Sequence, residues 1–517
     1  MFKNHPKGLL AASLSNMGER FGFYIMMAIL ALFISSKFGL DEQMTGYIYS
    51  VFYASIYVLA LVGGLIADKT RNYKGTILAG ILVMALGYLI LAIPTPTPVP
   101  NQALYLTLTC FGLFIIAFGN GLFKGNLQAL VGQMYDKPEY SRHRDSGFMI
   151  FYMFINVGAI FAPFIAVGLR NWWLKINHFD YNETLPELCH KYLGQNINTT
   201  ELANLEEYAS KALLDGTTVG DLGAFCNQYL EVFNRGFQYA FMAAIGAMFI
   251  SLLIYLFNKQ RFPDPARAKR ASGSAATASK EEIKMDADEI RRRIWALFAV
   301  FGIVIFFWFS FHQNGYSLTY FARDYINLDV IDINIGITRF KGAELFQSVN
   351  PFFVVFLTPV VMWVFGTLRK KGKEPSTPKK IGIGMGIAAL GYVFLLACST
   401  ALPDKEALTG MSSGALAAMK ISPMVMIGMY FILTVAELFI SPLGLSFVSK
   451  VAPPHLQGLM QGCWLAATAV GNLLIFIGGI LYTSVPLWAC WLVFVAACGA
   501  SMIVMLSMVK WLEKVAR

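Results

Sequence analysis

The chain has 517 residues, of which 56% are hydrophobic and only 14% are charged, and its formal net charge is +10. A soluble domain of this length would carry nearly twice that charged fraction, so the composition excludes a soluble globular protein and indicates a polytopic membrane protein. In this class an excess of Lys and Arg is typical of cytoplasmic loops, and we predict no nucleic-acid partner.

Twelve apolar stretches are long enough to cross a membrane, since a spanning helix needs about 20 mostly apolar residues. The first follows the N-terminal sequence MFKNHPKGLL, which has no small-residue cleavage site, so we interpret it as a retained helix and not as a signal peptide. An even number of spans places both termini on one side. The predicted spans are 8–36, 44–67, 75–94, 102–134, 146–169, 236–257, 294–322, 345–367, 381–399, 421–448, 456–481 and 486–510.

Two polar segments interrupt the spans and divide the chain. Residues 170–235 form an insertion with a helical pattern, ELANLEEYASKALL, and with Cys189 and Cys226, which can form a disulfide in an oxidising compartment. Residues 258–293 are rich in Ala, Ser and charge, as in a linker. We therefore predict a six-helix bundle at 1–257, a linker at 258–293 and a second six-helix bundle at 294–517. Most of the 41 Lys and Arg face the cytoplasm if both termini do.

The first span carries two charges in the sequence NMGERFGFY, residues 16–24. A charge at the bilayer centre costs about 2.5–3.5 kcal/mol, so such residues mark substrate or proton pathways. Glu19 and Arg20 are adjacent and therefore lie about 100° apart on a helix. We expect both to border one cavity without pairing tightly with each other, and we expect Lys124 of the fourth span to be the partner of Glu19.

Further polar residues are predicted at membrane depth in other spans. Glu437 is a second acid, in the tenth span, and His312 lies in the seventh. A zwitterion with separated ends would bridge the cationic region of the first half, Arg20 and Lys124, and the acidic Glu437 of the second half. The uncharged polar residues are Tyr57, Asn156, Asn350, Ser441 and Trp464. Taken alone, residues such as Tyr57, Asn156 and Asn350 are more often interhelical packing than ligands.

Several segments resemble the proton-dependent oligopeptide transporter family of the major facilitator superfamily. The family's first helix carries E-x-x-E-R-F-x-Y-Y, which resembles NMGERFGFY. In order along the chain, GLFKGNLQALVGQMY, FYMFINVGAIFAP, QSVNPFF, AELFISPLGLS and the tryptophan of QGCWLAATAVGN also resemble family segments. The resemblance implies an all-α fold of twelve transmembrane helices in two six-helix bundles, and proton-driven import of di- and tripeptides by alternating access.

The resemblance also implies roles for residues of this chain. Arg20 and Lys124 would meet the peptide carboxyl end, and Glu437 would hold the amino end. Glu19 would join Arg20 and Lys124 in proton coupling. The remaining peptide-binding residues would be Tyr24, Tyr57, Asn156, Asn350, Ser441 and Trp464.

Four positions depart from the family pattern. Asn16 replaces the first glutamate of the signature, Phe23 its first tyrosine, and Met27 an arginine that members often have. His312 stands where an acid is expected in the seventh helix. Since histidine has an ordinary pKa of about 6.5, we expect His312 to be the outer protonation switch. The alternatives are a facilitator that only equilibrates its substrate, and a transporter of small anions or amino-acid derivatives.

Two other classes of function are less favoured. An intramembrane enzyme would need a nucleophile with a base or a pair of metal ligands, and the sequence has no HExxH. A channel would repeat one kind of ligand around its pore, whereas these polar residues are mixed in type. We therefore predict a non-enzymatic monomer in a bacterial inner membrane, with peptide, protons and lipids as partners, the proton gradient as energy source, and no cofactor or metal.

Overall fold

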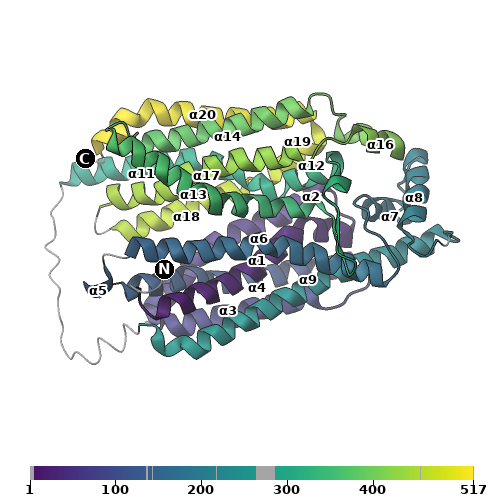
Figure 1. Cartoon of the computed structure of the whole chain (residues 1–517), viewed down its shortest axis with the longest axis horizontal. Coiled ribbons are helices and arrows are strands. Elements are labelled where there is room, and N and C mark those ends of the chain that lie inside the picture. The colour runs from purple at the N-terminus through teal and green to yellow at the C-terminus, as the bar shows by residue number, and fades with distance from the viewer. Residues whose placement is uncertain are drawn as a thin grey trace.

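The computed structural model describes residues 5–70, 72–135, 138–141, 144–216, 218–263, 286–453 and 456–515. Most of the predicted linker 258–293 lies outside these residues. The described chain forms an elongated bundle of long helices that run side by side (Figure 1). Twelve of them are long and apolar enough to cross a membrane, which confirms the predicted spans.

Six long helices from the first half of the chain pack together and form what we name the N-terminal bundle. α1 lies at its centre, against α4, α6 and α9. Because apolar side chains occur on all sides of α1, a position surrounded by other helices is the stable one, and α1 is buried along most of its length. The helices are α1 (Gly8–Phe38), α2 (Glu42–Thr70), α3 (Tyr73–Ala92), α4 (Gln102–Met134), α6 (Arg144–Ile176) and α9 (Leu222–Asn258), with short segments α5 (Pro138–Ser141) and η1 (Lys259–Arg261).

The later helices form the C-terminal bundle, in which α14 packs between α17 and α20, and α18 packs on α11. This bundle lies above the N-terminal bundle in Figure 1. Its elements are α11 (Ala287–Phe311), η2 (His312–Gly315), α12 (Ser317–Tyr325), η4 (Ala343–Ser348), α13 (Val349–Lys370), α14 (Thr377–Ser399), α17 (Met424–Val451), α18 (Gln457–Leu473), α19 (Phe476–Ser484) and α20 (Leu487–Val515).

Two predicted spans are interrupted helices. The seventh changes to a 3-10 turn, η2, and the eleventh breaks between α18 and α19. Glycines let the two breaks approach each other: a Cβ atom on Gly478 would lie 2.2 Å from the Gln313 side chain, and one on Gly471 would lie 2.7 Å from the Ile305 carbonyl oxygen. Non-helical backbone at membrane depth is tolerated where protein covers it, and it often marks binding sites in transporters.

The predicted insertion 170–235 is shorter in the structure, because both flanking helices extend into it. α6 continues to Ile176 and α9 begins at Leu222. The added turns of α9 are stabilised by aromatic packing, since the Phe225 and Tyr229 rings lie 5.8 and 5.4 Å from the ring of Phe179. The insertion segment is therefore residues 177–221. It contains α7 (Leu185–Leu193) and α8 (Thr199–Ala212), and α8 confirms the predicted helical pattern.

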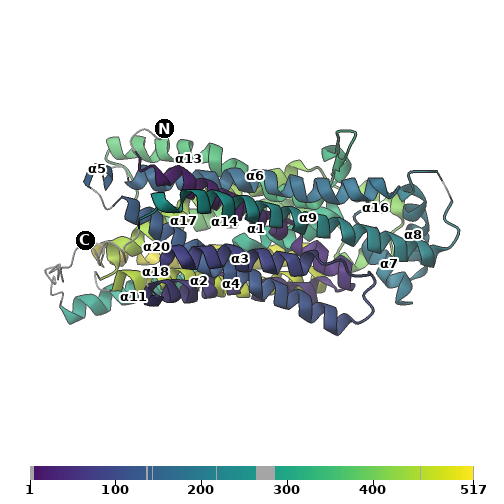
Figure 2. The same ribbon diagram turned by 90° about the horizontal axis from the view of Figure 1, so that it is seen from below.

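The insertion segment identifies the two ends of the molecule. α7 and α8 lie at one end, which we name the insertion end, and both chain termini mark the opposite, terminal end (Figures 1 and 2). At the insertion end, Cys189 of α7 and Cys226 of α9 are buried, and both are free thiols in this structure. Small elements complete the insertion end: η3 (Leu328–Ile331), α15 (Lys405–Leu408), α16 (Ser413–Met419), and the antiparallel strands β1 (Ile333–Asn334) and β2 (Arg339–Phe340), with Ile333 opposite Phe340.

The bundles contact each other along two seams. α2 packs on α18 and α19, and α6 packs on α13 and η4. Four candidate site residues lie on these seam helices, and the others lie on neighbouring elements; the four are Tyr57 (α2), Asn156 (α6), Asn350 (α13) and Trp464 (α18).

Candidate functional site

Glu19 and Arg20 form a bidentate ion pair within α1. Arg20 Nε and Nη2 each donate to a Glu19 carboxylate oxygen at 2.5 Å, and both side chains are buried. The expectation that these residues do not pair tightly is wrong, because the long arginine side chain folds back across the angle between neighbouring helix positions. Asn120 of α4 also donates to Glu19, at 2.8 Å. The buried carboxylate is thus held by three donors, as low-dielectric surroundings require.

Lys124 is not the partner of Glu19. Its Nζ atom lies 4.9 Å from the centroid of the Tyr57 ring on α2, a cation–π arrangement. Among the residues that the structure describes, no carboxylate lies within ion-pair distance of Lys124. The predicted pairing fails because Glu19 is already held by Arg20 and Asn120. Lys124 therefore keeps its capacity to bind an anion.

Glu437 of α17 lies in the C-terminal bundle with one neighbouring amide. Asn350 of α13 donates from Nδ2 to Glu437 at 2.9 Å and to the Thr434 hydroxyl at 2.9 Å. Asn350 thus orients the carboxylate. A carboxylate has about four lone-pair directions, so Glu437 retains acceptor capacity for an ammonium group.

Two tyrosines of the N-terminal bundle lie beside the cationic region. Tyr24 follows Arg20 by one turn of α1, and Tyr57 lies on α2. The Tyr57 ring carries Lys124 on its face. The structure therefore places Lys124 against a ring of the N-terminal bundle and Glu437 beside Asn350 in the C-terminal bundle.

His312 lies at the break of the seventh span and faces both bundles. Its Nδ1 is 2.5 Å from the Asn472 side-chain oxygen on α18. Its ring stacks on Trp308 at 4.9 Å and contacts the Tyr53 ring of α2 at 4.7 Å. The Asn472 oxygen is an acceptor, so it favours a proton on Nδ1 and leaves Nε2 as the acceptor nitrogen.

The other predicted residues occupy varied positions. Asn156 donates to the Tyr152 carbonyl oxygen one turn earlier on α6, at 3.1 Å. Ser441 is half-buried on α17. Trp464 is buried against α17, where Gly444 makes room for its ring: a Cβ atom at Gly444 would lie 2.0 Å from it. Trp464 thus sets the distance between α17 and α18.

Several contacts of the site were not predicted. Asn120 lies one helical turn before Lys124, and Tyr53 lies one turn before Tyr57; that spacing was the available signal. Thr434 likewise lies one turn before Glu437 on α17, whereas Asn472 has no such signal, because its partner His312 comes from another element. No group of three or more His, Cys, Asp or Glu suited to a metal ion occurs in the described ranges.

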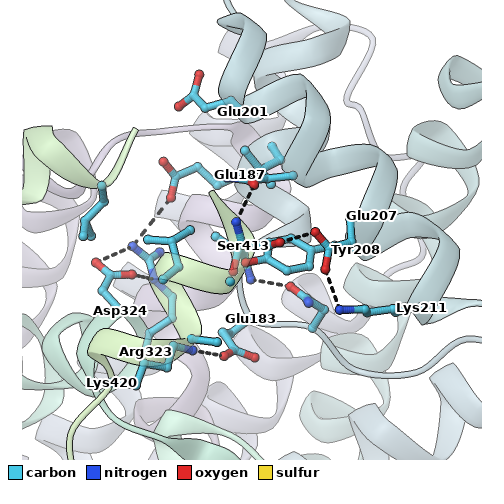
Figure 3. A pocket seen from close by; sticks show the side chains of 18 of the residues that line it. Glu183, Glu187, Glu201, Glu207, Tyr208, Lys211, Arg323, Asp324, Ser413 and Lys420 are labelled. Carbon is cyan, nitrogen blue, oxygen red and sulfur yellow. Dashed lines mark hydrogen bonds and ion pairs between the residues drawn. The ribbon is translucent and has the colours of Figure 1, made fainter. Parts of the chain in front are cut away.

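A second concentration of charge lies at the insertion end, around a cavity of about 360 Å³ (Figure 3). Arg323 of α12 contacts Asp324 at 2.6 Å, Glu42 of α2 at 2.8 Å and Glu187 of α7 at 3.6 Å. Lys405 of α15 contacts the same three acids. The ion pairs of Arg323 and Lys405 with Glu42 and Glu187 join the two bundles. Sequence patterns could not predict these pairs, because their members are far apart in the chain.

Comparisons with known proteins identify similar chains and similar folds. The chain is 28% identical to the peptide transporter YePEPT of Yersinia enterocolitica, over 91% of this chain and 87% of the relative. It is 26% identical to dipeptide and tripeptide permease B of Shigella dysenteriae, over 93% and 88%. A crystal structure of a POT family transporter in complex with 5-aminolevulinic acid superposes with a TM-score of 0.69, at 21% identity, over 100% of this chain and 98% of that one.

The family model described as POT family matches residues 74–277 and 266–485. The fold is that of the major facilitator superfamily, and the chain is an integral, multi-pass membrane protein whose named relatives are transporters. The protein belongs to the POT family of peptide transporters.

Proposed function

We propose that this protein imports di- and tripeptides by alternating access between its two bundles. The observation that supports the proposal is that Lys124 lies on the N-terminal bundle, against the Tyr57 ring, and that Glu437 lies on the C-terminal bundle, beside Asn350. Lys124 takes the peptide carboxylate and Glu437 takes the ammonium group. The bound peptide then links the bundles, and closure around it compensates each buried charge with an opposite one.

Proton coupling begins at Glu19 in this proposal. As an anion, Glu19 holds Arg20 through two hydrogen bonds, so the guanidinium is occupied. Protonation of Glu19 releases Arg20, which then joins Lys124 at the peptide carboxylate. This order of steps differs from the expectation that Lys124 is the partner of Glu19, because Glu19 is bonded to Arg20 instead. Asn156, Asn350, Tyr24 and Ser441 complete the peptide site.

His312 is the second protonation site of the proposal. It contacts Tyr53 on the N-terminal bundle and Asn472 on the C-terminal bundle, so a change of its charge acts on the seam between them. Trp464 sets the spacing of the helices beside it. The proton gradient supplies the energy, with no cofactor.

The membrane placement is also part of the proposal. A cytoplasmic location of both termini, with the insertion segment outside, is supported by the distribution of Lys and Arg along the sequence. Relatives from bacteria support a bacterial inner membrane. We propose a monomer surrounded by lipid as the functional unit.

A facilitator or a transporter of amino-acid derivatives is the second candidate. Asn16 replaces an acid of the family signature and Met27 replaces an arginine that members often have, and one family structure holds 5-aminolevulinic acid. An enzyme is a remote alternative. Residues 410–414 read GMSSG and match the hydrolase pattern G-x-S-x-G, but Ser412 caps α16 and does not stand on a strand–helix turn.

Purified protein in liposomes tests these proposals. A panel of dipeptides is offered with an imposed inward proton gradient, and accumulation is measured. Proton-coupled import predicts accumulation above equilibrium that collapses with a protonophore. Counterflow without a proton current supports the facilitator, and accumulation of 5-aminolevulinic acid without any dipeptide supports the second cargo.

A further inference from the structure

We propose that the insertion segment, residues 177–221, is a latch that holds the insertion end of the transporter closed and must release before that end opens. This inference rests on the proposed alternating-access function. It assigns a role to a segment that peptide binding does not use.

The latch contacts the C-terminal bundle through polar groups. Asn204 of α8 donates to the Met411 carbonyl oxygen at 2.7 Å and accepts from the Ser413 amide at 2.7 Å. Glu207 accepts a hydrogen bond from the Ser413 hydroxyl. Glu183 forms an ion pair with Lys420. Figure 3 shows two of these contacts at the cavity, Glu207 with Ser413 and Glu183 with Lys420.

The opposite side of the latch is fixed to the N-terminal bundle by apolar packing. Phe179 contacts Phe225 and Tyr229 of α9, and Tyr181 stacks with Phe233 at 6.1 Å. The His190 ring is also bonded to the Ser36 carbonyl oxygen at the end of α1, at 2.6 Å. The segment therefore moves with the N-terminal bundle.

This asymmetry selects the surface that separates. Pulling apart apolar packing exposes hydrophobic area to water, which is costly. The polar contacts of the latch border a cavity of about 360 Å³, so water can replace their partners as the surfaces part, whereas apolar groups gain no such replacement. When the bundles rock, the latch should therefore part from α15, α16 and Lys420, and stay on α9.

The latch is tied to the direct contact between the bundles. Glu187 of the latch and Glu42 of α2 share the same two cations, Arg323 and Lys405. Opening the insertion end separates both acids from both cations, so latch and bundle contact release together. Ionic strength weakens such contacts by screening.

Distances between two spin labels, measured by double electron–electron resonance, test the latch. Labels at Ala203→Cys on α8 and Ala415→Cys on α16 report its separation from the C-terminal bundle; the same labelling of the parent chain, with its seven cysteines, gives the background. The test variant combines Glu183→Gln, Glu187→Gln and Glu207→Gln. The control is Glu206→Gln, an exposed position on α8.

The latch proposal predicts that one short label-to-label distance dominates in the parent. The population with a longer distance should increase at least about threefold in the test variant and in the parent at high salt. The control variant should match the parent. An unchanged distribution in both the test variant and high salt overturns the latch. The salt experiment uses the parent chain, so it stands even if the triple variant misfolds. Loss of peptide uptake in the parent would instead contradict the proposed function, whatever the distances show.

Discussion

Arg170 of α6 donates a hydrogen bond to Glu344 of η4, and neither side chain is exposed. The guanidinium also lies 4.1 Å from the centroid of the Tyr181 ring. Since α6 and η4 belong to different bundles, this buried ion pair crosses the seam at the insertion end. Separation of the bundles there must replace it with water.

Removing one partner of this pair should destabilise the closed protein. Glu344→Gln leaves the Arg170 charge buried without a counter-charge, a change that typically costs about 3–5 kcal/mol. Arg170→Met combined with Glu344→Leu removes both charges and should cost less. Thermal unfolding in detergent measures both, and a double variant that melts no higher than Glu344→Gln contradicts the account.

Glu19→Gln should uncouple transport from the proton gradient. A neutral amide mimics the protonated acid and leaves Arg20 permanently released, so accumulation driven by the gradient should fall at least about tenfold, equivalent to about 1.4 kcal/mol. Counterflow of labelled dipeptide should persist. The control is Glu289→Gln, which removes an exposed pair with Arg293 on α11. Full proton-driven accumulation in Glu19→Gln would refute the coupling role.

His312→Ala should reduce the pH dependence of uptake measured from about pH 5 to pH 8, because it removes the protonatable ring at the seam between the bundles. Asn472→Ala should keep a pH-dependent step but move it, because Nδ1 loses the acceptor that fixes its proton. Uptake profiles over this range measure both variants. A parental profile in His312→Ala would remove it from the mechanism.

Acidification should not open the latch. Burial raises the pKa of Glu187, but Lys405, Arg323 and Lys191 outweigh it and hold that pKa at about 2. Because the pKa is depressed in the closed state, its contribution to closure is complete above the ordinary value of about 4.3 and is lost only as the pH falls toward 2. The label distances should therefore be constant from about pH 8 to pH 5. A longer component that appears by pH 5 contradicts this charge assignment.

The spans could be predicted because each is set by a local run of apolar residues, and a charged residue inside such a run is visible in the sequence. The interaction partners of these charged residues were harder to predict. Adjacent positions suggested that Glu19 and Arg20 point apart, but the length of an arginine side chain overrides the angle between Cβ atoms. The Glu19 carboxylate is therefore bonded to Arg20 and to Asn120, and not to Lys124.

The insertion end shows the other limit. Four charged residues meet there only because the two bundles and the short helices α7 and α15 come together; they are Arg323, Lys405, Glu42 and Glu187. No periodicity within one segment predicts such a meeting. The helix breaks at His312 and after Leu473 also depend on a neighbour, since each packs against the other. Local patterns therefore predicted the elements and their candidate residues, but not the partners.

Ligand binding with blocked dipeptides tests the central claim most directly. Affinity is measured by calorimetry for dialanine, its N-acetyl form and its C-terminal amide, on the parent, Lys124→Gln and Glu437→Gln. Dialanine should bind the parent and lose at least about tenfold in each variant. Acetylation should weaken binding to the parent but add nothing in Glu437→Gln, and amidation should behave likewise with Lys124→Gln. Unchanged dialanine affinity in Glu437→Gln would contradict a peptide held between opposite charges on the two bundles.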